Sequence, residues 1–194
     1  QRTGPATTLR FFTNIYVLPA RPPVAVAKLV GTAAVLSRNR VALGIGMGWM
    51  EEEFEAMEQP FAGRGRRADE MLDVIRTLWT GEVVEHHGAH YALPPLEVQP
   101  VPVWVGGTSD AALRRAARND GWISDLHTTE ELRAIRARID GFRREYGRDH
   151  LPFATGGATA EVSDLDLSVD GAGDHRDIDS HQRPYVAVAL AVAA

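Results

Sequence analysis

Residues 103–117 read VWVGGTSDAALRRAA, an apolar run that passes through two glycines into a helix-forming stretch. Valine and tryptophan are enriched in strands, so Val103–Val105 predicts a buried strand. Thr108 or Ser109 can accept hydrogen bonds from the first free N–H groups of the helix that follows. A strand, a glycine turn and a capped helix are the repeating unit of parallel α/β folds, so this stretch indicates that fold class.

The same alternation of strands and helices extends to both sides of this stretch. Further strands are predicted at Leu9–Leu18, Arg40–Gly46 and Trp122–Ser124, with a fifth near Phe153. The spacing of apolar residues predicts helices at 22–39, 66–80, 109–120 and 128–142, and the last begins with a capping box from Thr128 to Glu131. Strand and helix thus alternate four times, which predicts parallel βαβ units with right-handed crossovers.

A small hairpin is predicted at Val83–Leu93, with its turn around Gly88. His86, His87 and His90 form the pattern HHxxH there, which resembles the spacing of metal ligands. No carboxylate partner is fixed by the spacing, so a solvated hairpin is the interpretation we favour. We therefore predict no metal site, and the absence of cysteine from the sequence removes thiolate sites from consideration.

Composition and charge narrow the class of protein. The 194 residues are 44% hydrophobic, which is enough for the core of one globular domain. A net charge of −5 and a pI near 5.8 give no basic footprint of the kind that binds nucleic acid, so no such partner is predicted. The longest apolar run, Tyr185–Ala194, is shorter than the ~20 residues that cross a membrane, and no secretory signal is visible. We therefore expect a cytoplasmic protein with no membrane partner.

The turn Gly106–Ser109 is the first of three chemically distinctive loops. It follows a predicted strand, and the carboxyl ends of parallel strands carry the ligand sites of such folds. Glycines let backbone N–H groups approach a phosphate closely, and a helix N-terminus adds partial positive charge. Taken alone, the turn is equally compatible with a tight structural connection between strand and helix.

Two other strand segments interrupt the expected pattern. Gly44–Gly48 has the spacing GxGxG, but the third glycine comes one residue too early for the dinucleotide motif GxGxxG, so we interpret it as a closely packed strand end. Thr13–Ile15 places a polar pair inside an apolar strand, which indicates either a functional bulge or a polar side chain satisfied by a neighbour. The acidic run Glu51–Glu53 is predicted to be a solvated loop. Asp125 and His127 follow the fourth predicted strand, so they are candidates for the ligand-binding end of the sheet, without an assigned role.

Three segments, in this order and spacing, resemble the luciferase-like monooxygenases. They are residues 9–57 (LRFFTNIYVLPARPPVAVAKLVGTAAVLSRNRVALGIGMGWMEEEFEAM), 65–91 (GRRADEMLDVIRTLWTGEVVEHHGAHY) and 102–123 (PVWVGGTSDAALRRAARNDGWI). Within that family they look most similar to the actinobacterial branch that uses the deazaflavin coenzyme F420. The resemblance runs from Thr8 to Ile123 and continues weakly to Phe153.

The resemblance implies a (β/α)8 TIM barrel with a flavin or deazaflavin lying across its C-terminal mouth. A complete barrel needs about 250 residues, so we expect an incomplete one of four to five βα units within residues 1–153. The segment 154–194 is expected to be irregular and of uncertain structure. Because the family's opening strands have no counterpart before Leu9, one hypothesis is that the chain is a truncated or misread version of a longer gene product.

The resemblance also implies which residues contact the cofactor. In such enzymes a glycine turn holds the phosphate through backbone N–H groups, and a non-proline cis peptide in a bulge backs the ring system. The matching residues are Gly106, Gly107 and Thr108 for the phosphate, Asn14 and Ile15 for the cis bond, Gly48 near the ring and Ser124 on the phosphate side. Trp49 stands where some relatives carry an acidic group, so no catalytic acid or base is assigned.

The function expected from the resemblance is oxidoreductase or monooxygenase chemistry on a small organic substrate, by hydride transfer or oxygen activation. Coenzyme F420 is favoured over flavin mononucleotide (FMN), on resemblance alone, and a homodimer is compatible with the family. The alternative from another class is a non-catalytic remnant of a barrel that binds cofactor weakly or not at all. A phosphate-sugar enzyme on the same barrel would share the phosphate turn without sharing the ordered motifs.

Overall fold

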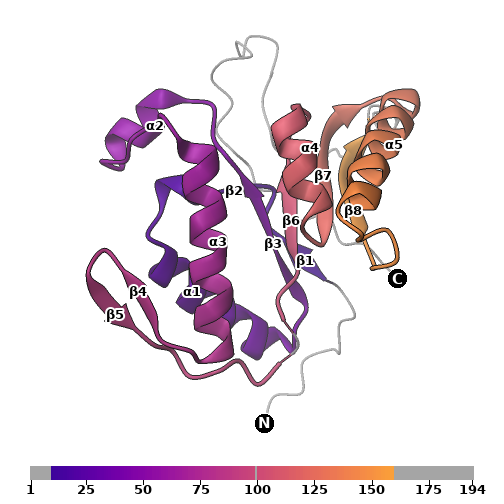
Figure 1. Cartoon of the computed structure of the whole chain (residues 1–194). Helices are drawn as coiled ribbons and strands as arrows, with labels where there is room; N and C mark the ends of the chain where they lie inside the picture. The colour runs from indigo at the N-terminus through magenta and orange to yellow at the C-terminus, as the bar shows by residue number, and fades with distance from the viewer. Residues whose placement is uncertain (1–9, 99, 160–194) are drawn as a thin grey trace, which may run out of the picture.

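A computed structural model describes residues 10–98 and 100–159 of the chain. Its helices and strands follow one another along the ribbon of Figure 1. In order they are β1 (Phe11–Phe12), β2 (Tyr16–Val17), the single 3-10 turn η1 (Leu18–Ala20), α1 (Pro23–Ser37), β3 (Val41–Gly46), α2 (Glu51–Ala56), α3 (Arg64–Thr80), β4 (Val84–His86), β5 (Ala89–Tyr91), β6 (Val103–Gly106), α4 (Asp110–Ala117), β7 (Gly121–His127), α5 (Thr129–Glu145) and β8 (Ala154–Thr159).

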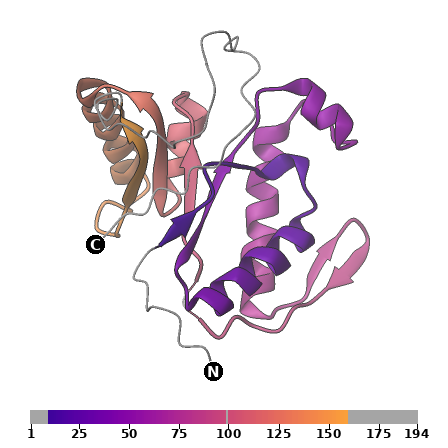
Figure 2. The ribbon, with the colours of Figure 1, turned by 180° about the vertical axis from the view of Figure 1, so that it is seen from behind.

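One parallel sheet organises the described residues. Its strands lie in the order β1, β3, β6, β7, β8, and β2 pairs with β3 beyond the end of β1. The sheet is curled, and Figures 1 and 2 show it flanked by α1 and α3 at one end and by α4 and α5 at the other. The predicted incomplete (β/α) barrel is therefore confirmed, and the fifth strand expected near Phe153 is β8.

The strand predicted at Leu9–Leu18 is broken into β1 and β2, which corrects the sequence-based expectation for this segment. Phe12 pairs with Ala42 and Tyr16 pairs with Ile45, so four steps along one strand face three along the other. The extra residue makes a β-bulge, which is one of the two alternatives predicted for Thr13–Ile15. The bulge lies within the sheet, just before the carboxyl end of β3.

The two faces of the sheet carry different cores. Leu43 and Ile45 of β3 and Val105 of β6 are fully buried in the large core shared with the helices. The residues between them face the opposite way, because side chains alternate along a strand. Phe12, Ala42 and Ile123 form a second cluster on that inner face, with Ile15 and Trp104 packed against it.

The helix ends follow the predicted capping signals. Ser109 accepts a hydrogen bond from the backbone N–H of Ala112, and Thr128 and Glu131 form the capping box at the start of α5. The acidic run Glu51–Glu53, predicted as a loop, instead opens the short helix α2. Carboxylates are favourable in the first turn of a helix, and the fully buried Phe54 ties α2 to the core.

The hairpin prediction is confirmed by the antiparallel pair β4 and β5. His87 and Gly88 both have positive φ, as a two-residue hairpin turn requires. Within residues 10–98 and 100–159, no group of three or more His, Cys, Asp or Glu side chains could hold a metal ion. The search for membrane-spanning helices over the same residues found none that is long and apolar enough.

The predicted division into 1–153 and 154–194 stays a prediction, because residues 160–194 lie outside the described residues. The first six residues of the segment 154–194, which was expected to be irregular, form β8 (Ala154–Thr159) and pair in parallel with β7. The apolar run Tyr185–Ala194 also lies outside the described residues.

Candidate functional site

The residues predicted to contact a cofactor gather at one end of the sheet, around the carboxyl ends of its strands. Gly106 ends β6, and Gly107 and Thr108 follow it. Gly48 follows β3, Ser124 lies near the end of β7, and Asn14 and Ile15 belong to the bulge before β2. This is the edge at which parallel α/β folds bind ligands.

Ile15 joins the bulge to the predicted phosphate turn. A Cβ placed on Gly106 would lie 3.2 Å from Ile15 Cγ2, and one on Gly46 would lie 1.7 Å from Ile15 Cδ1. The Ile15 side chain therefore rests across the ends of β3 and β6, in space that a larger residue would fill. Two segments that are about ninety residues apart in the sequence meet at this point.

The bulge is docked on β3 through Thr13. The Thr13 hydroxyl donates to the carbonyl of Gly44 at 2.7 Å and accepts from the N–H of Gly44 at 2.9 Å. A Cβ on Gly44 would lie 1.9 Å from the Thr13 carbonyl oxygen, so only glycine permits this approach. The second alternative for Thr13–Ile15, a polar side chain satisfied by a neighbour, is thus also true of Thr13. The bond between Asn14 and Ile15 is cis, as the resemblance implied.

The predicted phosphate turn has a backbone conformation that a side chain at residue 107 would disturb. Gly107 has φ of +104°, in the region that side chains disfavour, and a Cβ there would lie 3.2 Å from Ala112 Cβ. Thr108 and Ser109 are exposed, and α4 starts directly after them with N–H groups that have no partner within the helix. The turn therefore fits an anionic group such as a phosphate, held by backbone donors.

β7 holds the turn from the other side. The indole N–H of Trp122 donates to the carbonyl of Gly107 at 2.9 Å, and Trp122 itself is buried. Ser124, predicted to approach the phosphate side, is only 3% exposed, and its hydroxyl lies 2.6 Å from the Asp125 carbonyl oxygen. Ser124 is one residue beyond Ile123, the register partner of Gly106, so it stands level with the turn.

An ion pair between helices fixes the direction of α4. The guanidinium of Arg115 is 6% exposed and reaches Asp69 of α3 with distances of 2.6 and 2.9 Å, and the carbonyl of Gly65 at 3.0 Å. At the other end of α4, Asp110 pairs with Arg138 of α5. That pairing offsets a negative charge that stands beside the turn.

Gly48 and Trp49 lie in the loop between β3 and α2. The carbonyl of Gly48 accepts from Arg64 Nε at 3.0 Å, and a Cβ on Gly48 would lie 2.7 Å from the Phe54 ring and 2.8 Å from Val17. This contact network explains the glycine by close packing, and an approach of Gly48 to a cofactor ring stays a prediction. Trp49 is 63% exposed.

A cavity of about 320 Å³ opens beside the bulge, between β2 and α2. Ile15, Tyr16 and Val17 line one side of it, and Glu53 and Met57 lie on the other. Arg21 also lines the cavity and donates to Met57 Sδ at 3.2 Å. The cavity gives room for a small molecule next to the predicted position of the ring.

Trp104 is the main residue that sequence reasoning missed. Its ring lies over the inner face of β7 and β8, because a Cβ on Gly121 would come within 2.6 Å of it and one on Gly156 within 2.9 Å. It also packs against Phe12, with ring centroids 4.9 Å apart. The signal was present as Gly121, the register partner of Trp104 on β7, and as Gly156 on β8, two residues beyond the partner of Gly121, but the register is visible only once the sheet is paired.

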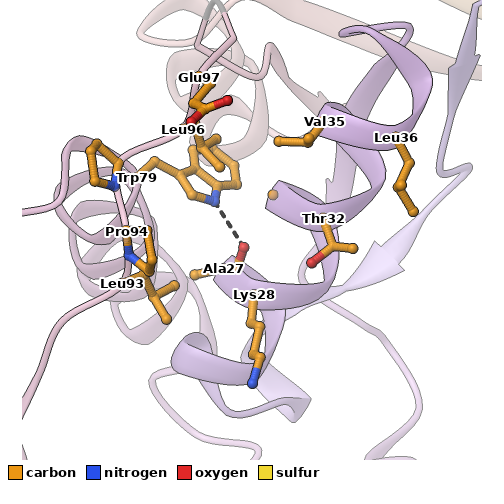
Figure 3. A pocket seen from close by; sticks show the side chains of 12 residues that line it. Ala27, Lys28, Thr32, Val35, Leu36, Trp79, Leu93, Pro94, Leu96 and Glu97 are labelled. Atoms are coloured by element: carbon orange, nitrogen blue, oxygen red, sulfur yellow. Dashed lines mark hydrogen bonds between the residues drawn. The ribbon is translucent and has the colours of Figure 1, made fainter.

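A second groove lies on the outer helix layer and is not part of this site. Figure 3 shows it between α1 and the segment that follows α3, with the indole of Trp79 at its centre donating to the carbonyl of Ala27 at 2.9 Å. Its volume is about 440 Å³, and Lys28 and Glu97 are its charged lining residues. Because it lies against helices rather than strand ends, the turn at Gly106 does not open into it.

Glu131, in the first turn of α5 after the end of β7, has a lowered pKa. The backbone N–H of Thr128 donates to it at 2.8 Å and lowers its pKa, the Thr128 hydroxyl adds to the effect, and the charge of His127 contributes in the same direction. In the hairpin, the pKa of His86 is lowered by burial and then by the neighbouring His87. Glu131 belongs to α5 and His86 to the hairpin, so neither is assigned to the turn at Gly106.

Comparisons with a family model and with known sequences agree on one family, and comparison with solved structures agrees on the fold. Residues 4–163 match the family model described as luciferase-like monooxygenase. An uncharacterized protein of Mycobacterium tuberculosis, Rv0940c, is 46% identical over 147 residues, which are 73% of this chain and 51% of that protein. The FMNH2-dependent dimethylsulfone monooxygenase of Pseudomonas putida is 27% identical over 131 residues, 62% of this chain and 36% of the enzyme.

Among solved structures, an F420-dependent secondary alcohol dehydrogenase in complex with an F420-acetone adduct has the same fold. The TM-score is 0.64 with 18% sequence identity, over 79% of this chain and 50% of the dehydrogenase. The chain spans about half the length, or less, of the relatives it matches.

Proposed function

Because this chain belongs to the luciferase-like monooxygenase family, we propose that it is a flavin- or deazaflavin-dependent oxidoreductase acting on a small organic substrate. The bound cofactor would supply hydride transfer, and a reduced flavin can also activate oxygen. The chain's own residues would bind and orient that cofactor and exclude water from its ring. A homodimer is part of the same proposal on the strength of the family resemblance, and a cytoplasmic location is part of it on the strength of the sequence expectations.

The proposal gives a role to each group of residues at the carboxyl ends of the strands. Gly107, Thr108 and the start of α4 would hold the phosphate through backbone N–H groups. Ile15 would present an apolar surface to the ring, and the cavity lined by Ile15 and Met57 would receive the substrate. No side chain is assigned as a catalytic acid or base, and Trp49 takes no such role in the proposal.

One observation carries the proposal. The Ile15 side chain lies over Gly106 and Gly46, so the segment proposed to back the ring touches the segment proposed to hold the phosphate. A ring and a phosphate of one molecule need binding groups within a single site, and this contact supplies them. A structural turn with no ligand would not require the bulge to reach it.

Coenzyme F420 is the cofactor we propose first, because the ordered motifs resemble the deazaflavin-using branch of the family. The P. putida relative at 27% identity is an FMNH2-dependent monooxygenase, which favours FMN as the second candidate. Both carry a phosphate on a ribityl chain attached to a tricyclic ring, so the same residues of this site are proposed to contact whichever of the two is bound.

Cofactor titration of the whole 194-residue chain tests the proposal. Quenching of cofactor fluorescence is measured with F420 and with FMN, on wild type, Ile15→Ala and Leu36→Ala. Leu36 is 80% exposed on α1, so its variant controls for loss of an apolar side chain away from the site. We expect saturable binding of one cofactor, weakened about tenfold by Ile15→Ala, a change of about 1.4 kcal/mol, and unaffected by Leu36→Ala.

Two results would contradict the proposal. A soluble, folded chain that binds neither cofactor would favour the non-catalytic remnant. Equal binding by wild type and Ile15→Ala would remove the bulge from the cofactor site, even if a cofactor binds.

A further inference from the structure

The end of β7 contains a histidine whose tautomer is fixed by its neighbours. His127 Nδ1 lies 3.0 Å from the Ser124 hydroxyl oxygen and 3.2 Å from the Asp125 carbonyl oxygen. The Ser124 hydroxyl lies 2.6 Å from that same carbonyl, which can only accept, so the hydroxyl donates its single hydrogen to it. Both neighbours of Nδ1 are then acceptors. The proton of the neutral imidazole therefore sits on Nδ1, and Nε2 is left as its basic nitrogen.

A bulge in β7 brings this imidazole to the end of the strand. Ser124 pairs with Gly157 of β8 and His127 pairs with Thr159, so three steps along β7 face two along β8. The extra residue changes which way the side chains beyond it point, as a bulge does at the rim of a barrel. His127 is half-buried, and Ser124, which contacts its Nδ1, is buried.

Trp122 connects the imidazole to the phosphate turn. The ring centroids of Trp122 and His127 are 6.1 Å apart, and the Trp122 indole N–H donates to the carbonyl of Gly107. One indole thus donates to the carbonyl of the turn through its nitrogen and lies next to the His127 ring, with the two ring planes tilted by 52°. The family resemblance assigned His127 no role. Among the described residues, its hydrogen-bond contacts are made through Nδ1 and none through Nε2.

We propose that His127 is an additional ligand for the cofactor's phosphate, taking up a proton at Nε2 and donating it as a hydrogen bond to a phosphate oxygen. The inference rests on the proposed function and adds a residue to it. Nδ1–H stays bonded to Ser124 and Asp125, so binding adds one proton and breaks no existing contact. A hydrogen bond between an imidazolium and a phosphate is charge-assisted, which makes it stronger than a neutral one.

The charged groups near the imidazole are compatible with this role. On α5, Glu131 is the carboxylate that interacts with the charge of His127, and it is held by Thr128 at the helix start. On β7 itself, Asp125 is exposed to solvent. At the start of α4, Asp110 is paired with Arg138 and so repels a phosphate less than a free carboxylate would.

Two substitutions of His127 separate its two nitrogens. His127→Asn keeps a donor at the position of Nδ1, and so keeps the contact with Ser124, but it removes Nε2. His127→Gln keeps a polar group near Nε2 and loses the Nδ1 contact. Binding of each is measured with FMN and with riboflavin, and with F420 and its phosphate-free deazaflavin core, because each pair differs in the phosphate.

We expect wild type to prefer the phosphorylated member of each pair, and His127→Asn to reduce that preference about tenfold, or about 1.4 kcal/mol. His127→Gln should retain part of the preference. The affinity for riboflavin should stay unchanged in His127→Asn, which a merely structural role would not predict.

A spectroscopic measurement gives a readout that does not depend on the affinity. In 15N-labelled protein, the imidazole signal absent from His127→Asn is assigned to His127. Adding FMN should move that signal toward the protonated form, and adding riboflavin should leave it in the Nδ1–H form.

The outcomes distinguish this inference from the proposed function. If wild type binds no cofactor, the proposed function fails. If wild type prefers FMN over riboflavin and His127→Asn keeps the whole preference, only the role of His127 is refuted. An imidazole signal that responds equally to riboflavin and FMN would refute it as well.

Discussion

The replacement Gly44→Ala is the sharpest test of how the bulge is held. The new Cβ would lie 1.9 Å from the Thr13 carbonyl oxygen and 2.5 Å from Ile123 Cδ1, where ordinary contacts begin at 3.4 Å. The backbone of the bulge would have to retreat, and it would take the Thr13 hydroxyl away from both backbone groups of Gly44.

The free-energy change can be worked out from these contacts. Two hydrogen bonds contribute about 1 kcal/mol each, and overpacking a buried site costs about 1–3 kcal/mol. The lower entropy of the unfolded alanine variant offsets roughly 0.5 kcal/mol. We therefore expect Gly44→Ala to lower the free energy of unfolding by about 3 kcal/mol.

Urea unfolding followed by tryptophan fluorescence and by circular dichroism measures this change. Gly141→Ala is the matched control, because the nearest atom to its Cβ is Arg144 Nη2 at 4.0 Å in the helix α5. There the same replacement should raise stability by roughly 0.5–1 kcal/mol, since alanine is the better helix former. Thr13→Val removes the hydroxyl without adding a Cβ to β3, and it should cost about 2 kcal/mol. The reasoning is refuted if Gly44→Ala is as stable as wild type, or if Gly44→Ala is more stable than Thr13→Val.

Arg115→Met should lower the free energy of unfolding by about 2 kcal/mol, because it breaks the hydrogen-bonded pair with Asp69, and a thermal melt that matches wild type would contradict this. Gly107→Ala should weaken cofactor binding about tenfold in the titration above, whereas Gly63→Ala, also at positive φ but with nothing within 4 Å of its Cβ, should not. Glu131→Gln should destabilise the protein at neutral pH. Because the folded pKa of Glu131 lies below its ordinary value of 4.5, its contribution is complete above that value and lost as pH falls through the folded pKa, so pH-dependent melts of the two proteins should converge in acid.

Local sequence signals predicted most of the elements of the fold. The capping box at Thr128, the cap at Ser109 and the turn at Gly88 depend on residues a few positions apart, and each is present where expected. The parallel pairing of the strands followed from the alternation of strand and helix, as βαβ units require. Each cap and turn depends on residues within one short segment, so the sequence of that segment is enough to predict it.

Contacts between distant segments decided the features that the sequence did not reveal. The strand at Leu9–Leu18 reads as continuous, and its break depends on Thr13 reaching Gly44 thirty-one residues later. The helix α2 depends on Phe54, which packs edge-on against Phe61 with ring centroids 5.2 Å apart. A local pattern carries no information about such partners.

The candidate site shows the same division. Gly106 and Gly107 were identifiable from the strand, the turn and the cap around them. The contact of Ile15 with the turn, the ring of Trp104 over the inner face and the pairing of Ser124 with His127 were not identifiable. The bulge at Ser124 shifts the register by one residue, and no rule of alternation locates it.

The position of Ile15 also bears on how this protein can change during evolution. Its side chain occupies space that Gly46 and Gly106 leave open on two different strands, so the three positions are coupled in stability. Alanine at 46 would require the Ile15 side chain to shift or residue 15 to become smaller, so the cost of that replacement depends on residue 15. Homologous sequences should therefore vary at these three positions together, and a library that randomises them singly would miss the viable combinations.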